Sequence, residues 1–256
     1  MPEQHKPWHL GPLCAYDLET SGTNTRVDRI VTGYVCTVLG RAEGRRQMIG
    51  ADVLISPGVP IPAEATAVHH VTDEMAREKG CDPVDGVNSV AEALSRALIA
   101  RIPVVGHHVH YDLSMLYWEC LRHGVPTVAE RMGLPPAAAV GPIIDTLVLD
   151  KHVDPYRRGS RRLDDSKGPG LASLYGVPLA RAHTADADAI AAARVAVKIA
   201  EKYPRLISPD AVQLHKEQKA WAFDQRASLE TYFRKKDPNK VLDRCWPMCI
   251  DPDHPV

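Results

Sequence analysis

The 256-residue sequence has few aromatic residues, no excess of either charge and no long apolar run. With only 2 Phe and 5% aromatic residues, its core has to be built mainly from aliphatic side chains and alanine. The formal net charge of −1 means that no global basic surface marks a nucleic-acid-binding protein, so any site for a polyanion has to be local. No apolar run approaches the ~18 residues needed to cross a bilayer, and we expect no membrane partner.

The chain also lacks an apolar secretory leader, and its six cysteines are scattered. Both features predict a reduced, cytoplasmic protein. Cys245 and Cys249, followed by His254, invite comparison with a zinc site. A fourth ligand at the spacing of zinc fingers is missing, so we do not predict a structural zinc there.

Three strands are expected early in the chain, at residues 13–19, 29–39 and 45–55. A short turn at 40–44 joins the last two, and so short a connection can only pair them antiparallel. From residue 62 the pattern becomes helical. The later expected elements are short helices opening at 62 and after Thr72, a helix around 90–101, a strand at 103–106, a helix at 111–121 ending at Gly124, a strand-to-helix unit from 143, and helices at 171–175 and 185–202.

This order predicts an α/β protein whose mixed sheet combines an antiparallel meander with parallel strands and is flanked by helices. We divide the chain into a main domain at 1–205 and a helical C-terminal extension at 206–256. The extension carries an amphipathic helix at about 210–236 that packs on the main domain or, alternatively, on a partner or a second copy in a homodimer. Its expected packing stripe comprises Ala211, Leu214, Trp221, Ala222, Leu229, Tyr232 and Phe233.

Two acids close the first strand, and side chains two residues apart on a strand point the same way. Asp17 and Glu19 therefore repel each other unless a cation lies between them, and oxygen ligands favour Mg²⁺ or Mn²⁺. A solvated strand end is an equally weighted alternative for this pair alone. Asp112 and Asp188 lie at further strand-to-helix or loop-to-helix junctions, and His183 precedes Asp188 by five residues.

Four stretches in order resemble the DEDDh (DnaQ-like) 3′–5′ exonucleases of the ribonuclease H-like superfamily. They are Asp-Leu-Glu-Thr at 17–20, Val-His-His-Val-Thr at 68–72, Gly-His-His-Val-His-Tyr-Asp-Leu at 106–113, and His-Thr-Ala-Asp-Ala-Asp-Ala at 183–189. The proofreading subunit of bacterial DNA polymerase, RNase T and oligoribonuclease belong to that family. The C-terminal part is similar to extensions of actinobacterial members, and a phage-type member is the other possibility that we retain.

The resemblance implies a ribonuclease H-like fold and four metal ligands, Asp17, Glu19, Asp112 and Asp188. Asp17 would bridge two divalent cations, Glu19 and Asp188 would complete one site, and Asp112 would hold the second ion, partly through water. Two ions about 4 Å apart serve both the attacking and the leaving oxygen of a phosphodiester. His183 would be the general base, since imidazole titrates near neutral pH.

The resemblance also implies contacts to the terminal nucleotide. Thr20 and the backbone after Glu19 would hold it, with Val71 and Tyr111 near its base or sugar. Two positions depart from the family pattern, because His108 replaces the usual Asn and His70 the usual Gly. His70 either crowds the pocket or adds a phosphate contact, so we include it among the substrate-binding residues.

Several residues have structural alternatives. Asp112 and Asp145 could be helix caps, and for Asp145 the cap is the favoured interpretation. Asp186 competes with Asp188, which we prefer because it has the family spacing from His183. A trio of histidines at 107, 108 and 110 lacks the acid or cysteine that would complete a metal site. A basic loop either contacts phosphates or is solvated; its members are Arg157, Arg158, Arg161, Arg162 and Lys167.

The sequence thus predicts a metal-dependent 3′–5′ exonuclease that acts on the 3′ end of single-stranded DNA and releases nucleoside 5′-monophosphates. The alternatives are an RNA-trimming exoribonuclease of the RNase T or oligoribonuclease type, and a non-catalytic module that binds nucleic acid or a protein. The expected macromolecular partner is a polymerase or a repair factor.

Overall fold

The computed structural model describes residues 7–39, 47–165, 168–179, 183–205 and 207–250. The predicted turn at 40–44, Lys167 and His254 lie outside these residues. The strands are β1 (Leu13–Thr20), β2 (Ile30–Leu39), β3 (Gln47–Leu54), β4 (Val104–Gly106) and β5 (Ile143–Asp145). The helices are η1 (Trp8–Leu10), α1 (Ala63–His69), α2 (Asp73–Lys79), α3 (Pro83–Ile99), α4 (Val109–His123), α5 (Val128–Arg131), α6 (Thr146–Val153), α7 (Leu171–Leu174), α8 (Ala185–Lys202) and α9 (Ala211–Phe233).

The five strands form one mixed sheet in the order β3-β2-β1-β4-β5. The meander β1-β2-β3 is antiparallel, and β1-β4 and β4-β5 are parallel pairs. This confirms the predicted fold class. β1 is consequently the strand at which antiparallel pairing on one side meets parallel pairing on the other.

Local signals in the sequence explain several of the helix ends. The Thr72 side chain accepts a hydrogen bond from the Met75 amide and caps α2, as expected. Gly124 ends α4 with a φ of 63°, a left-handed conformation that glycine adopts without steric cost. α3 begins earlier than the expected residue 90, because Asp82 caps it and a proline occupies its first turn.

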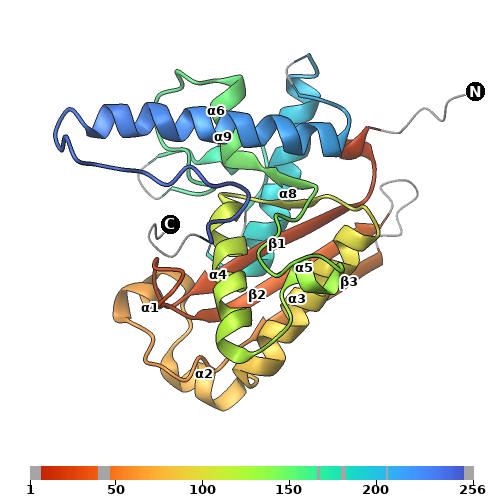
Figure 1. Ribbon diagram of the computed structural model, residues 1–256, viewed down its shortest axis with the longest axis vertical. Coiled ribbons are helices and arrows are strands. Elements are labelled where there is room, and N and C mark those ends of the chain that lie inside the picture. The colour runs from red at the N-terminus through yellow and green to blue at the C-terminus, as the bar shows by residue number, and fades with distance from the viewer. Residues whose placement is uncertain (1–6, 40–46, 166–167, 180–182, 206, 251–256) are drawn as a thin grey trace, which may run out of the picture.

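Helices cover both faces of the sheet (Figure 1). On one face, α3 and α4 bury aliphatic residues against Cys14, Tyr16 and Leu18 of β1. On the other face, the alanine-rich α8 lies close to the strands and packs on Leu13 and Ala15. β1 therefore presents alternate residues to two separate cores, as its period of two requires.

The long helix α9, blue in Figure 1, lies along α6 and the edge strand β5. Leu214 and Ala222 of the predicted stripe are buried, but Tyr232 and Phe233 are exposed, so that part of the prediction is wrong. Gln218 and Glu230 are buried instead, because they bond to backbone groups of β5 and of Leu242. The extension thus packs on the main domain, while its separation at residue 206 stays a prediction. Among the described helices none is long and apolar enough to cross a membrane.

Candidate active site

Asp17 and Glu19 lie at the carboxyl end of β1, two residues apart, on the same face as Ala15. That face is the one covered by α8. The pairing of β1 with β2 shifts its register between Glu19 and Thr20, so the strand stops being regular directly after the second acid. Sheet alternation therefore directs both carboxylates toward the first turn of α8.

The first turn of α8 supplies the third acid. Asp188 accepts a hydrogen bond from the His183 backbone N–H on Oδ2, at 3.1 Å. One carboxylate oxygen each of Asp17, Glu19 and Asp188 lies within 4.8 Å of the others. Asp186 does not join this group; its Oδ1 accepts a hydrogen bond from the Thr184 hydroxyl at 2.7 Å. The structure thus separates two acids that the sequence offered as competitors.

The fourth acid comes from a different element. Asp112 is buried in the first turn of α4, and its carbonyl oxygen accepts a hydrogen bond from the Tyr16 hydroxyl at 3.1 Å. Its carboxylate lies outside the group of three, but its charge helps to raise the pKa of Asp17. Asp112 is therefore close enough to affect the charge of Asp17, but its carboxylate oxygens are farther from the other three acids than those acids are from one another.

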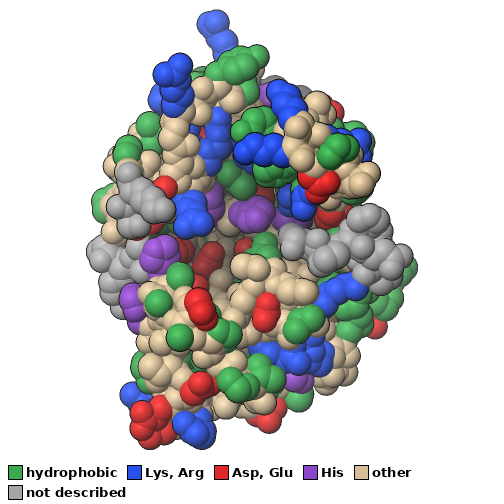
Figure 2. Space-filling model, turned by 90° about the vertical axis from the view of Figure 1, so that its left-hand side faces the viewer, with side chains coloured by type: hydrophobic (Ala, Val, Ile, Leu, Met, Phe, Trp, Pro, Cys, Tyr) green, Lys and Arg blue, Asp and Glu red, His purple; other side chains and the backbone are tan. Residues whose placement is uncertain are grey.

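These side chains line a cavity of about 450 Å³ at the carboxyl ends of β1 and β4. Figure 2 shows the hollow with acidic and histidine side chains inside it and Lys and Arg side chains along one rim. The cavity brings together all five residues predicted to carry the chemistry. The lining residues are Asp17, Leu18, Glu19, His107, His108, Tyr111, Asp112, Leu147, Lys151, Arg161, Arg162, His183 and Asp188.

All four acids hold their protons more tightly than exposed carboxylic acids do. Burial, followed by the charges of Asp112, Glu19 and Asp188, raises the pKa of Asp17 well above its usual range. Burial and the Asp188 charge raise the pKa of Glu19 to about 7. Burial raises the pKa of Asp188 to about 6, although the His183 amide opposes that shift. Burial likewise raises the pKa of Asp112.

This arrangement suits a divalent cation. Oδ1 of Asp188 is buried and has no hydrogen-bond partner among the described residues. A buried carboxylate oxygen without a partner costs free energy, and so do carboxylates that face each other. A hard cation bound by oxygen ligands removes both costs at once, so the residues present fit Mg²⁺ or Mn²⁺.

The residues predicted to hold the nucleotide fall into two groups. Tyr111 lines the cavity, and its hydroxyl lies 2.8 Å from that of Thr20 and 2.5 Å from the Gly22 carbonyl. Thr20 is therefore linked to the cavity through Tyr111, although it does not line it. His70 and Val71 do not line the cavity either, and His70 is exposed.

Both departures from the family pattern fall on unusual backbone. His70 has a φ of 63° and His108 a φ of 57°, in the left-handed region. Glycine and asparagine favour that region, and histidine is among the other residues that enter it most readily. Both histidines therefore occupy a backbone conformation in which glycine or asparagine is the more usual residue.

The remaining histidines of the trio have hydrogen-bond partners. His107 Nδ1 lies 2.8 Å from the Thr146 hydroxyl, and His110 Nε2 lies 3.2 Å from the Arg226 guanidinium. Burial, aided by the neighbouring His108, lowers the pKa of His107 to about 3 and that of His110 well below its usual range. Both side chains are therefore neutral; His107 lines the cavity, whereas His110 is buried in α4 and does not.

Asp145 is the predicted cap, since its Oδ1 accepts hydrogen bonds from the amides of Leu147 and His108, both at 2.9 Å. It ties the end of β5 to the left-handed residue that opens α4. Asp145 therefore fixes the backbone of His108 and Leu147, which line the cavity, without lining it itself.

The basic loop is anchored by an acid that the sequence analysis did not single out. Asp150 is fully buried and pairs with Arg157 at 2.8 Å and with Arg161, and its Oδ1 accepts a hydrogen bond from the Tyr175 hydroxyl at 3.0 Å. Arg161 also lines the cavity, whereas Arg158 is exposed and does not. The loop is thus neither fully solvated nor uniformly directed at a substrate.

Lys151 is a cavity residue that the sequence analysis missed. It lies on α6, and burial, then the nearby Arg226, lowers its pKa below the usual value. The available signal was its place one turn and a half after the Asp145 cap, on a helix that starts at a strand end.

A larger hollow of about 580 Å³ lies elsewhere, between β3 and α3. Of its ionisable residues, Glu92 and Arg96 form an ion pair with each other. It contains no group of converging carboxylates, so size alone does not make it the catalytic site.

A family profile described as exonuclease, RNase T, matches residues 14–196, well over half of the chain. The chain belongs to the RNase T exonuclease family. It is a DEDDh-type exonuclease of the ribonuclease H-like superfamily, as the sequence predicted. The matched residues include all four acids and His183.

This exonuclease is similar to parts of larger proteins. It is 27% identical over 184 residues to the PolC-type DNA polymerase III of Pediococcus pentosaceus, covering 71% of this chain and 11% of the polymerase. Exonuclease I from Methylocaldum szegediense shares its fold with a TM-score of 0.57 and 22% identity, covering 84% of this chain and 45% of that one. E. coli Exonuclease I in complex with a dT13 oligonucleotide has a TM-score of 0.55 and 18% identity, over 77% of this chain and 42% of that one. The chain thus spans less than half the length of each.

Proposed function

We propose that this exonuclease removes nucleotides from the 3′ end of single-stranded DNA and releases nucleoside 5′-monophosphates. The observation that carries the proposal is the group of three carboxylates, from β1 and α8, in one cavity with Asp112 and His183. In this proposal Asp17, Glu19, Asp112 and Asp188 would hold the two divalent cations, Mg²⁺ or Mn²⁺, that the family resemblance implies. When bound, the ions polarise the scissile phosphate and offset the charge that develops on its oxygens.

In this proposal His183 accepts the proton of the attacking water. It lines the cavity beside the acids, and its backbone N–H is bonded to Asp188, so the same contact positions the base and a ligand. A general base within reach of the attacking oxygen contributes a rate factor of about 10²–10⁴. Asp112, on α4, would contribute to holding the second ion.

Thr20 and Tyr111 hold the terminal nucleotide in this scheme. Their adjacent hydroxyls and the Gly22 carbonyl offer both hydrogen-bond donors and acceptors at the end of β1. His70 and Val71, in the turn that follows α1, are proposed to contact the nucleotide from outside the cavity. Lys151, Arg161 and Arg162 line the cavity and would bind phosphates further along the strand.

Single-stranded DNA is the proposed substrate for two reasons. The polymerase match is to a DNA polymerase, and the Exonuclease I structure contains a dT13 oligonucleotide. A DNA polymerase or a repair factor is accordingly the proposed partner. RNA trimming is the outcome that would overturn the choice of polymer while leaving the nuclease chemistry intact.

The test is shortening of 5′-labelled DNA and RNA oligonucleotides, single- and double-stranded, with Mg²⁺ or Mn²⁺. We expect single-stranded DNA to be shortened from its 3′ end, and EDTA to abolish the reaction. Asp17→Ala and His183→Ala should each reduce the rate by at least about 100-fold while circular dichroism shows a folded protein. Asp186→Ala is the matched control, because this acid of the same helix turn bonds to Thr184 instead.

Failure of the wild-type protein to shorten any oligonucleotide with either ion would reject the enzymatic proposal. It would leave a module that binds nucleic acid or a protein. Unchanged activity in EDTA would reject the role of the cations.

A further inference from the structure

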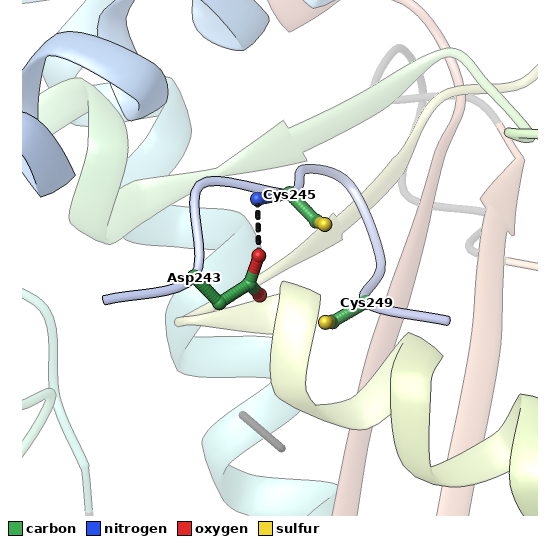
Figure 3. Close-up of side chains that lie close together, drawn as sticks. All are labelled: Asp243, Cys245 and Cys249. Atoms are coloured by element: carbon green, nitrogen blue, oxygen red, sulfur yellow. Dashed lines mark hydrogen bonds between the residues drawn. The ribbon is translucent and has the colours of Figure 1, made fainter. Parts of the chain in front are cut away.

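Three possible metal ligands converge in a second place, in the irregular segment that follows α9. One ligand atom each of Asp243, Cys245 and Cys249 lies within 4.8 Å of the others. Figure 3 shows the two sulfur atoms and the carboxylate facing a common space. We propose that these residues bind a zinc ion that cross-links residues 243–249 to one another beside α4.

The donor atoms select the metal. Two thiolates with one carboxylate suit Zn²⁺, whereas the oxygen donors of the catalytic cavity suit Mg²⁺ or Mn²⁺. Zn–S and Zn–O bonds of about 2.3 and 2.0 Å in a tetrahedron require ligand atoms roughly 3.5 Å apart. Shifts of less than about 1 Å close the observed group to that size. The three residues between the cysteines fall within the usual spacing of paired cysteine ligands.

The carboxylate of Asp243 gives a second, independent indication. Its Oδ1 accepts a hydrogen bond from the Cys245 amide at 2.7 Å. Its Oδ2 is buried and has no hydrogen-bond partner among the described residues. A buried carboxylate oxygen needs a proton donor or a cation, and the nearby sulfur atoms make the cation the better answer.

Both ends of the segment are held in place without the metal. The Cys249 amide donates to the Ser114 hydroxyl of α4 at 2.7 Å, and Cys249 is 2% exposed. At the other end, the Leu242 amide and the Arg244 guanidinium bond to the buried Glu230 of α9, at 2.9 and 3.0 Å. The ligands are therefore presented by backbone that is fixed on two helices, which lowers the entropy cost of binding the ion.

The proposal differs from the sequence analysis, which predicts no structural zinc at this pair of cysteines. The pair of cysteines was set aside because a further ligand at finger spacing was missing. Asp243 supplies one from the other side, only two residues before Cys245. The proposal rests on these three ligands, because His254 lies outside the described residues, and it leaves the fourth position of the tetrahedron to water.

The alternative for two cysteines at this distance is a disulfide. All six cysteines lie in the described residues, and none forms one. A disulfide would use both sulfur atoms and would leave Asp243 Oδ2 buried without a hydrogen-bond partner. Metal content and thiol titration distinguish the two states.

The experiment measures zinc in the full chain purified under reducing conditions without chelators. We expect about one tightly held zinc per chain in the wild type, and at least a tenfold loss in Cys245→Ser, Cys249→Ser and Asp243→Asn. Cys81→Ser, a half-buried cysteine between α2 and α3, is the matched control. Asp17→Asn should keep its zinc, which assigns the ion to this site and not to the catalytic cavity.

A second measurement does not depend on variants that fold. Replacement of zinc by Co²⁺ in the wild type should give thiolate-to-cobalt charge-transfer absorption and the visible bands of a tetrahedral site. Absence of that absorption, or a Cys245–Cys249 disulfide in a protein without zinc, would overturn the proposal. Neither result bears on the proposed nuclease activity.

Discussion

Glu19 ionises reluctantly in this protein, and this has a measurable consequence. Burial and the Asp188 charge raise its pKa from 4.5 to about 7. An acid whose pKa is raised by folding contributes most stability below its unfolded pKa, and that contribution is lost as pH rises toward the folded value. Between about pH 4.5 and pH 7, Glu19 therefore destabilises the metal-free protein progressively.

We expect Glu19→Gln and the wild type to have similar melting temperatures in EDTA at pH 5. At pH 8 the variant should be more stable, on the order of 2 kcal/mol. The buried histidines titrate in the opposite sense but are common to both proteins, so the difference isolates the acid. Mn²⁺ at pH 8 should reverse the order. A variant that is less stable than the wild type in EDTA at pH 8 would contradict this account.

At the scale of elements, Asp150 holds the basic loop to α6. It is fully buried and bonds to Arg157, Arg161 and Tyr175. Removing one partner of a buried ion pair costs about 3 kcal/mol, because the other charges lose their compensation. We expect Asp150→Asn to unfold at lower denaturant concentration and to raise KM for oligonucleotides, since Arg161 also lines the cavity. Arg158→Ala, at an exposed position of the loop, should leave the denaturant concentration of unfolding unchanged and should change KM by no more than a small factor.

A second element prediction concerns the edge of β5. Gln218 of α9 accepts a hydrogen bond from the Asp145 amide at 2.8 Å and donates one to the Ile143 carbonyl at 2.9 Å. Gln218→Ala leaves both backbone groups buried without partners, at about 1–3 kcal/mol each. We expect the Gln218→Ala variant to have a lower free energy of unfolding and a lower kcat, because Asp145 holds the residue at which α4 begins. Gln213→Ala, an exposed glutamine one turn earlier, is the control. Equal stability of the two variants would show that the edge does not depend on α9.

Helices α8 and α9 show where the prediction from sequence succeeded and where it failed. The period of α8 and its flanking residues predict both of its ends, and β-branched runs with short turns predict the meander. The hydrophobic pattern of α9 misplaced Tyr232 and Phe233, because it counts apolar side chains and cannot register backbone groups that need partners. Gln218 and Glu230 are buried for that reason, and their backbone partners, in β5 and at Leu242, are brought to them only by the folded chain.

For the candidate site, too, some residues were predicted from the sequence and others were not. Spacing and resemblance predicted Asp17, Glu19, Asp112, His183 and Asp188, and the structure brings them to one cavity. Lys151 and Asp150 were not predicted, since nothing in their local sequence distinguishes them from other helix residues. Their roles depend on how α6 meets a loop that is distant from the first motif.

At the scale of the whole molecule, a net charge of −1 conceals a local separation of charge. Acids lie inside the cavity, and Lys151, Arg161 and Arg162 line it beside them. Three phosphate contacts on a single strand give a slope of log K against log salt of about −2. We therefore expect affinity to fall by roughly 20-fold between 50 and 200 mM salt.

This prediction is checked by fluorescence anisotropy with a labelled single strand, on the inactive His183→Ala protein with Mn²⁺ held constant. Lys151→Ala in that background should reduce the slope by about 0.7. A slope near zero would mean that the basic residues of the cavity make no phosphate contacts.

The use of α9 to complete β5 also bears on biosynthesis. All residues of the catalytic cavity come before Gln218 in the sequence, so they emerge from the ribosome before Gln218 does. Until then the amides of Ile143 and Asp145 lack their partners, and an open strand edge of this kind is a template for wrong pairing. During synthesis there is therefore an interval in which all catalytic residues have left the ribosome but α9 has not. In that interval the nascent chain is most prone to mispairing at the β5 edge.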